Sequence, residues 1–312
     1  MRGAAGVANE RAVVCPSSIQ LDLFLDSRAV VLANEVVTAL LARDAARAQE
    51  RLDEMKRDAH DHPGLPALST LVSALAQWRM PAREPAQIAL LVAQLESEFG
   101  PAAEAGLGLE APLFLAPFFR ELAAAADGLS YDRGNPTAYR AALCLRCGDF
   151  SDAEQAALAV ANWSETPDAL HWLTLARYRL HGVDAARASL FALAWREPNR
   201  LATVLTELSD ELLDRQWLAF ERACDWDDIR EADLPSWFPA WYLVEHPAAG
   251  KDLADASFPD AAPAQAARLL VRLFDMERQG NSRTLVGLRA CLRDLNPGLF
   301  SLYMARRAVQ HR

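Results

Sequence analysis

The feature that most constrains the fold is a regular 31-residue spacing in the middle of the chain. A polar or acidic residue stands before a proline at Asn135-Pro136, Thr166-Pro167 and Glu197-Pro198. Proline fits the first turn of a helix, because the N–H that it lacks would have no partner there, and Asn or Thr before it can cap the exposed amides. The spacing therefore predicts three helix starts at one interval, which indicates a repeated structural unit.

Each repeated unit is expected to contain two helices. Gly148 and Gly182 stand where the first helix of the first two units would end, a position that favours left-handed backbone, and the third unit lacks such a glycine. Ser151 to Glu154 form a capping box that predicts the start of a second helix. A tryptophan keeps nearly the same interval at the end of each second helix, as Trp163, Trp195 and Trp226.

This segment, residues 135–227, resembles tetratricopeptide repeats. The run from Leu143 to Ala153 is similar to that family's end of the first helix and start of the second, and Thr174 to Gly182 fits the same place in the next unit. The family period is nearer 34 residues, so the likeness is one of architecture with divergent repeats. The resemblance implies an α-solenoid of antiparallel helix hairpins, whose concave surface holds peptides or proteins.

Composition predicts an all-α protein. The hydrophobic share is 52%, with Ala and Leu dominant, and Val and Ile form no alternating runs bounded by turns. Outside the repeats, helical spacing predicts helices at 27–42, 44–59, 65–79, 85–98, 111–127, 264–279, 283–294 and 298–309. The expected organisation is a flexible tail at 1–19, a linear motif at 20–25, helical hairpins at 26–134, the repeats at 135–228, and an aromatic-rich segment with the last helices at 229–312.

Five residues near the start of the chain suggest a partner. Gln20, Leu21, Asp22, Leu23 and Phe24 resemble the pentapeptide Gln-Leu-(Ser/Asp)-Leu-Phe, with which many bacterial replication and repair proteins bind the DNA sliding clamp. The resemblance implies an extended segment whose Leu23 and Phe24 fill an apolar pocket. Burying these two side chains contributes roughly 1.5–3 kcal/mol each, which after ordering costs leaves about micromolar affinity. In the alternative, these apolar residues pack on the first helix pair, with Leu25 as a hydrophobic staple.

A second candidate interface lies in the aromatic-rich segment. Trp237, Phe238, Trp241 and Tyr242 form a cluster of the large side chains that anchor many protein interfaces. Bulky residues are equally suited to covering the end of a helical core. The sequence leaves both interpretations open.

Signatures of catalysis and cofactor binding are missing from the sequence. It contains no glycine-rich phosphate loop, dinucleotide fingerprint or nucleophile elbow. Cys144 and Cys147 could supply half of a zinc site, but no second pair follows at the required spacing, and close helix packing explains them as well. We therefore expect no enzyme activity, no cofactor and no metal.

Charge and cysteine content limit the classes of partner and the cellular compartment that the sequence predicts. The net charge of −10 argues against a sequence-independent grip on nucleic acid, although arginines gather near the C-terminus. No apolar run approaches the length of a membrane span, the N-terminus does not resemble a secretion signal, and the five cysteines form no disulfide framework. These features predict a cytoplasmic protein without membrane, nucleic-acid or small-molecule ligands.

Together the sequence predicts a bacterial protein-protein interaction adaptor. In this hypothesis Gln20 to Phe24 dock on the sliding clamp in replication or repair, while the helical body holds an unidentified protein or peptide. The alternative is a tetratricopeptide-like scaffold unrelated to the clamp, in which the pentapeptide is packed in the fold.

Overall fold

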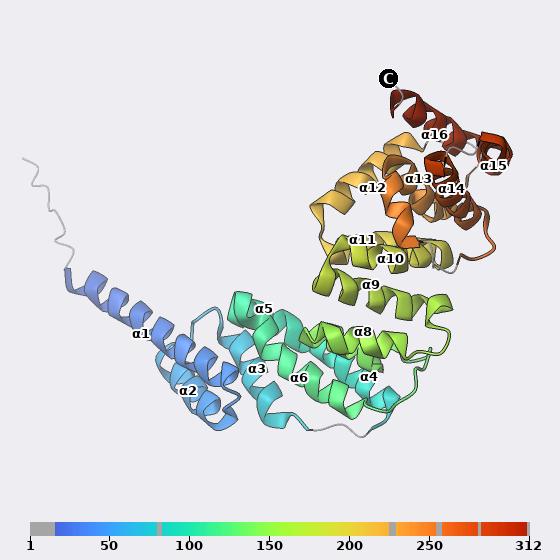
Figure 1. Cartoon of the computed structure of the whole chain (residues 1–312). Helices are drawn as coiled ribbons and strands as arrows, with labels where there is room; N and C mark the ends of the chain where they lie inside the picture. Colours follow the sequence, from blue (N-terminus) through green and yellow to red (C-terminus); the bar gives the residue numbers. More distant parts are fainter. Residues whose placement is uncertain (1–15, 80–82, 225–228, 254–257, 280–281, 311–312) are drawn as a thin grey trace, which may run out of the picture. The chain divides into compact units, whose positions relative to one another are not determined.

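The computed structural model describes residues 16–79, 83–224, 229–253, 258–279 and 282–310, and only the backbone at 16–27, 252, 282, 283, 309 and 310. Throughout these ranges the regular structure is helical, and no strand is present in them (Figure 1). This confirms the all-α fold class.

The chain forms two compact units. Of the described residues, those up to 79 and those at 91–118 form one unit, and those at 83–90 and from 119 onward form the other. The division falls inside helix α6 (Ala111–Ala125), so the boundary expected at 134 lies within the second unit.

The first unit begins with a pair of packed helices, α1 (Pro16–Leu41) and α2 (Ala45–Asp58). Arg28 on α1 forms an ion pair of 2.5 Å with Asp58 on α2, and Asp44 caps α2 by accepting from the amide of Arg47. The predicted helix start at Ser27 was wrong, because α1 begins at Pro16. Residues 20–24 are therefore helical in this structure, whereas the clamp hypothesis needs an extended segment.

A long helical stretch follows α3 (Leu65–Gln77) and contains α4 (Pro85–Gln94), a π-helix (Leu95–Phe99), α5 (Gly100–Leu107) and α6. The π-helix precedes Pro101, which has no N–H to continue a regular helix, and the amide of Gly100 reaches back to the carbonyl of Leu95. Among the described residues, Pro85–Ala125 alone is long and apolar enough to cross a membrane, by length and composition. The core helices of folded proteins pass the same test, and 33% of the most apolar window of Pro85–Ala125 is buried here.

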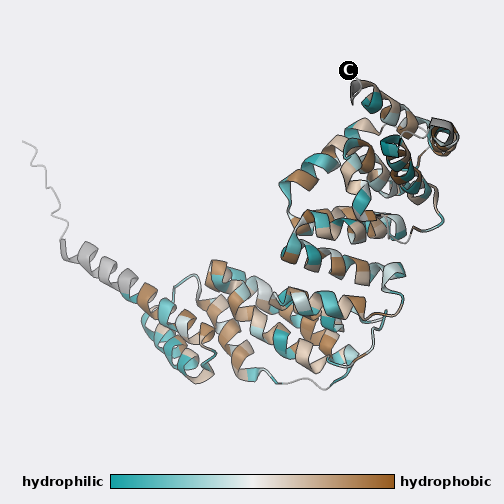
Figure 2. Ribbon diagram, viewed as in Figure 1, coloured by the Kyte–Doolittle hydropathy of each residue, from teal (hydrophilic) through white to brown (hydrophobic). Residues whose placement is uncertain are grey.

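The second unit holds the remaining helices. They are α7 (Arg140–Cys147), α8 (Phe150–Leu158), α9 (Pro167–His181), α10 (Val183–Arg196), α11 (Leu201–Leu208), α12 (Glu211–Ala223), α13 (Phe238–Glu245), α14 (Ala262–Gln279), α15 (Ser282–Leu295) and α16 (Pro297–Gln310). Neighbours along the chain pack together, as α7 with α8, α9 with α10, and α14 with α15. Helix α8 also packs on α9, and Figure 1 shows α8 to α11 stacked. Most of these helices alternate apolar and polar positions, as helices with one buried face do (Figure 2).

The turns between these helices follow the sequence pattern in part. Gly148 and Gly182 end α7 and α9 with φ of 82° and 81°, which confirms their predicted role. In the corresponding turn between α11 and α12, Ser209 takes the left-handed conformation with φ of 52°, which is uncommon for a residue with a side chain. Asp210 then caps α12 by accepting from the amides of Leu212 and Leu213.

Three details of the repeat pattern differ from the prediction. Of the three prolines, Pro167 alone begins an α-helix, since Pro136 and Pro198 begin 3-10 helices just before α7 and α11. Helix α8 starts at Phe150, so Ser151 lies in its first turn and is not the cap. Trp195 lies in the last turn of α10, but Trp163 comes after the end of α8, and Trp226 lies outside the described residues.

The aromatic cluster belongs to the hydrophobic core. Trp237, Phe238, Trp241 and Tyr242 are exposed by 6, 0, 3 and 5%. The ring of Phe238 contacts those of Phe191, Trp217 and Phe220 at centroid distances of 5.4 to 6.3 Å. These four side chains therefore pack in the core, as the second interpretation expected, and they do not form an exposed interface in this structure.

Candidate functional site

A groove crosses three helices of the predicted repeats. It encloses about 370 Å³, and its walls come from α7, α9, α11 and the 3-10 helices before α7 and α11. We name it the first-helix groove, because α7, α9 and α11 are the first helices of the three predicted units. Its lining residues are Pro136, Thr137, Ala142, Leu145, Arg146, Asp168, His171, Trp172, Leu175, Arg200 and Glu207.

Helix α9 supplies the centre of this groove. Asp168, His171, Trp172 and Leu175 lie at positions i, i+3, i+4 and i+7, a spacing that places side chains on one face of a helix. The opposite face of α9 carries Leu170 and Leu173, which are buried. The sequence therefore divides α9 into one face for the core and one for the groove.

The floor of the groove is apolar and rigid. Trp172 is 6% exposed and stacks on Tyr139 at 5.4 Å, with Tyr131 edge-on at 5.8 Å. Leu145 and Leu175 are partly exposed beside it. A ligand that entered here would meet an apolar surface held in place by aromatic contacts.

Charged residues line the rim of the groove in pairs. Asp168 accepts a hydrogen bond of 2.6 Å from the Arg200 guanidinium and one of 2.5 Å from the Tyr131 hydroxyl. The His171 ring lies 2.6 Å from the Glu207 carboxylate. The hydrogen bond from His171, helped by the charges of Arg146 and Arg200, holds the pKa of Glu207 below its ordinary value.

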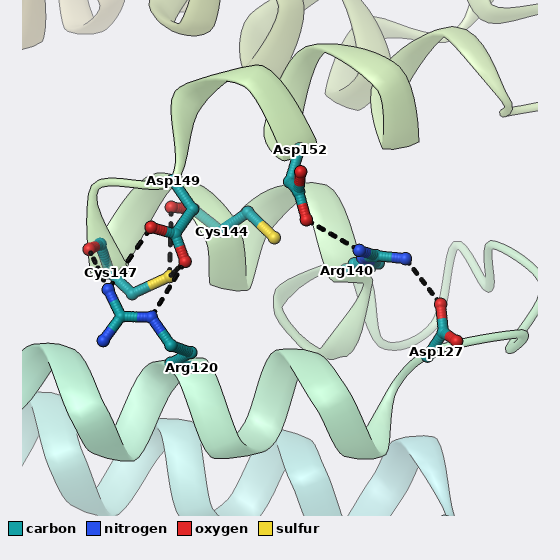
Figure 3. A network of polar contacts seen from close by, with 7 residues as sticks. All are labelled: Arg120, Asp127, Arg140, Cys144, Cys147, Asp149 and Asp152. Atoms are coloured by element: carbon teal, nitrogen blue, oxygen red, sulfur yellow. Dashed lines mark hydrogen bonds and ion pairs between the residues drawn. The ribbon is translucent and has the colours of Figure 1, made fainter.

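A second polar network fixes the first hairpin beside the groove (Figure 3). Arg120 reaches from α6 to Asp149 in the turn between α7 and α8, with the Nε donating at 3.0 Å, and lowers the pKa of that carboxylate. The Cys147 thiol also donates to Asp149 at 3.3 Å. Arg140 bridges Asp127 and Asp152.

This second network has the chemistry of a structural contact. Cys144 and Cys147 are buried, and the hydrogen bond between them lowers the pKa of the Cys144 thiol and, together with burial, raises the pKa of the Cys147 thiol. A thiol must lose its proton to bind a metal. In the described part of the chain, no cluster of three or more His, Cys, Asp or Glu side chains could hold a metal ion.

The sequence-predicted site residues and the groove do not coincide. The side chains of Gln20, Leu21, Asp22, Leu23 and Phe24 lie outside the described residues, so their role stays a prediction. The aromatic cluster is core. Sequence reasoning missed the groove residues, although their signal was present in the i, i+3, i+4, i+7 pattern of α9 next to the repeated Pro positions.

Comparisons of this chain with protein-family models, with curated proteins and with solved structures give no match.

Proposed function

We propose that this chain is a non-enzymatic adaptor in which the first-helix groove holds a peptide segment of a partner protein. In this proposal the helices form an α-solenoid of antiparallel hairpins similar to tetratricopeptide repeats. The observation that carries it is the groove itself, whose lining comes from the first helix of three successive units. Stacked helical hairpins bury their cores between neighbours and leave such continuous surfaces for binding.

The composition of the groove suits a peptide. Its volume of about 370 Å³ lies within the range of small binding sites, and it combines an apolar floor with polar groups at the rim. Leu145 and Leu175 would contact apolar side chains of the ligand, while the rim pairs would receive its backbone and polar groups. Because the floor is already ordered, binding loses little entropy on the protein side.

Peptide selection on the full chain tests the groove. We expect random peptides selected on the folded protein to bind with about micromolar affinity, and Leu175→Gln to weaken them by about tenfold. Leu180→Gln is the matched control, because Leu180 is exposed on the same helix and does not line the groove. Affinities equal in both variants, or a selection that yields no binder, would refute the groove proposal.

The second part of the proposal is recruitment to the bacterial sliding clamp through Gln20 to Phe24. It rests on the match of all five residues to the clamp-binding pentapeptide. Because α1 begins at Pro16, the segment must unwind about two and a half helical turns to bind in an extended form, and burial of its apolar residues in the pocket has to offset that loss.

Clamp binding by the full chain tests this second part. Leu23→Ala combined with Phe24→Ala should abolish binding to the purified clamp in surface plasmon resonance. Val30→Ala with Val31→Ala is the control, since these two residues lie farther along α1 and are 53% and 52% exposed. If the Leu23 and Phe24 double variant still binds the clamp, Gln20 to Phe24 do not mediate the binding, and recruitment through this pentapeptide is refuted while the groove proposal is unaffected.

The helical backbone of residues 20–24 favours a second candidate, a scaffold unrelated to the clamp. In that case the pentapeptide is structural, and the Leu23 and Phe24 double variant lowers the melting temperature. Thermal unfolding of the same variants distinguishes the two candidates.

A further inference from the structure

A separate cavity near the C-terminus is lined by positive charge. It encloses about 340 Å³ between the 3-10 helix Pro247–Leu253, α14 and α16. We name it the C-terminal pocket. Its lining residues are Pro247, Ala248, Lys251, Phe274, Glu277, Arg278 and Arg307.

Glu277 organises the base of this pocket. Its carboxylate is 8% exposed, receives Arg307 at 2.7 Å and Arg289 at 3.0 Å, and accepts a hydrogen bond from the Tyr303 hydroxyl. Two guanidiniums and one carboxylate therefore meet at the base of the pocket, and these three groups together carry a net positive charge. Because these contacts come from α14, α15 and α16, they also hold Arg307 in a fixed position at the pocket wall.

The charges around the pocket do not balance. Lys251, Arg278, Arg289 and Arg307 are positive, whereas the described carboxylates beside them are Glu277 and Asp275, the latter paired with Arg278. The excess is two positive charges. The sequence carries the same bias, since residues 262–312 contain nine arginines and three carboxylates in a chain whose net charge is −10. Such segregation of charge favours an anionic ligand.

We propose that the C-terminal pocket binds a phosphate monoester with a small apolar body. A phosphate monoester carries about −1.5 to −2 charges at neutral pH, which matches the excess of the lining. Arg and Lys are the side chains that bind phosphate, the first through its planar fork and the second as a point charge. Pro247, Ala248 and Phe274 form the apolar wall that receives the remainder of the ligand.

The cavity size supports an ester over a bare ion. A volume of about 340 Å³ is larger than a single phosphate group needs, and part of the pocket wall consists of apolar side chains that cannot hydrogen-bond to phosphate. The pocket shares no lining residue with the first-helix groove, so the inference does not depend on the proposed function.

Calorimetric titration of the full chain with three probes tests the ligand class. Phenyl phosphate combines a dianion with an apolar ring, phenyl sulfate keeps the ring with one charge, and inorganic phosphate lacks the ring. We expect phenyl phosphate to bind with a Kd below about 1 mM, and each of the other two to bind about tenfold more weakly. Equal affinity for phenyl sulfate and phenyl phosphate would overturn the proposal. The absence of phenyl phosphate binding at about 10 mM would overturn it as well.

Substitutions at exposed lining residues locate the binding. Lys251→Gln with Arg278→Gln removes two positive charges without touching Glu277, and should weaken phenyl phosphate by at least about tenfold. Arg272→Gln with Arg293→Gln is the matched control, because it also removes two positive charges at exposed residues that do not line the pocket. A control variant as weak as the Lys251 and Arg278 variant would show a general charge effect and contradict the site.

Discussion

The first-helix groove and the C-terminal pocket use the same residue types and differ in how many cations surround each carboxylate. In the groove Asp168 pairs with Arg200, and Glu207 pairs with His171. In the pocket the single carboxylate of Glu277 contacts both Arg289 and Arg307. The groove is therefore close to neutral at its rim, while the pocket stays cationic. The net charge of a chain therefore does not give the charge of an individual site, because the charge of a site depends on the few ionisable side chains that line it.

The two regions share part of their hydrophobic core. One buried cluster contains Leu170 of α9, Phe238 of α13 and Tyr303 of α16, and Leu175 of the groove packs against it, whereas Trp172 on the groove floor belongs to a second buried cluster. A substitution in this cluster should therefore affect both regions, whereas substitutions of the charged groups should affect one.

The largest expected effect comes from Phe238→Ala. Phe238 is fully buried and contacts several rings, so its truncation should lower the free energy of unfolding by about 3–5 kcal/mol. Urea unfolding followed by circular dichroism measures it. Leu212→Ala, on an exposed residue of α12, should change stability by less than about 0.5 kcal/mol. A small effect of Phe238→Ala would mean that the two regions do not rest on this core.

The next effect separates the two regions. Glu277→Gln leaves Arg289 and Arg307 without their carboxylate and should cost about 1–3 kcal/mol, since the carboxylate is buried but its partners are partly exposed. Asp168→Asn removes the partner of Arg200, which is 37% exposed, and should cost about 1 kcal/mol or less. Unfolding in urea compares the two variants, and the reverse order would contradict the contrast between pocket and groove.

A smaller effect concerns acid stability of the groove. The folded-state pKa of Glu207 lies below its ordinary value because His171 donates to it. The pair therefore contributes stability above the ordinary glutamate pKa of about 4.3, and this contribution is lost as the pH falls through the lower folded value. His171→Gln should reduce the loss of stability between about pH 5 and 3, measured by unfolding at each pH. An unchanged acid profile would show that the pair contributes nothing.

The smallest effect is one of reactivity. Cys291 is exposed, whereas Cys144, Cys147 and Cys224 are buried, and burial raises the pKa of Cys224 to about 12. In a Cys15→Ser background, one thiol should react quickly with a disulfide reagent at pH 8, and Cys291→Ser should remove this reaction. Fast reaction of a second thiol would mean that the helices of the second unit open easily.

Much of the fold follows from local sequence. The helix ends at Gly148 and Gly182 were predictable because left-handed backbone favours glycine, and the last helices were predictable from the polar residues and prolines that precede them. The start of α1 was missed although Pro16 stands at its first helical position, because Cys15 before it is not a polar capping residue, whereas Ser27 is one.

The sites depended on contacts between segments distant in sequence. The sequence alone determined the all-α class, the interval of the central helices and the gathering of arginines near the C-terminus. Only the tertiary structure decided that Trp237, Phe238, Trp241 and Tyr242 are core, that Arg200 meets Asp168, and that Arg289 and Arg307 converge on Glu277. The physical reason is that helix formation depends on neighbours within a few residues, whereas burial and ion pairing depend on side chains that packing brings together.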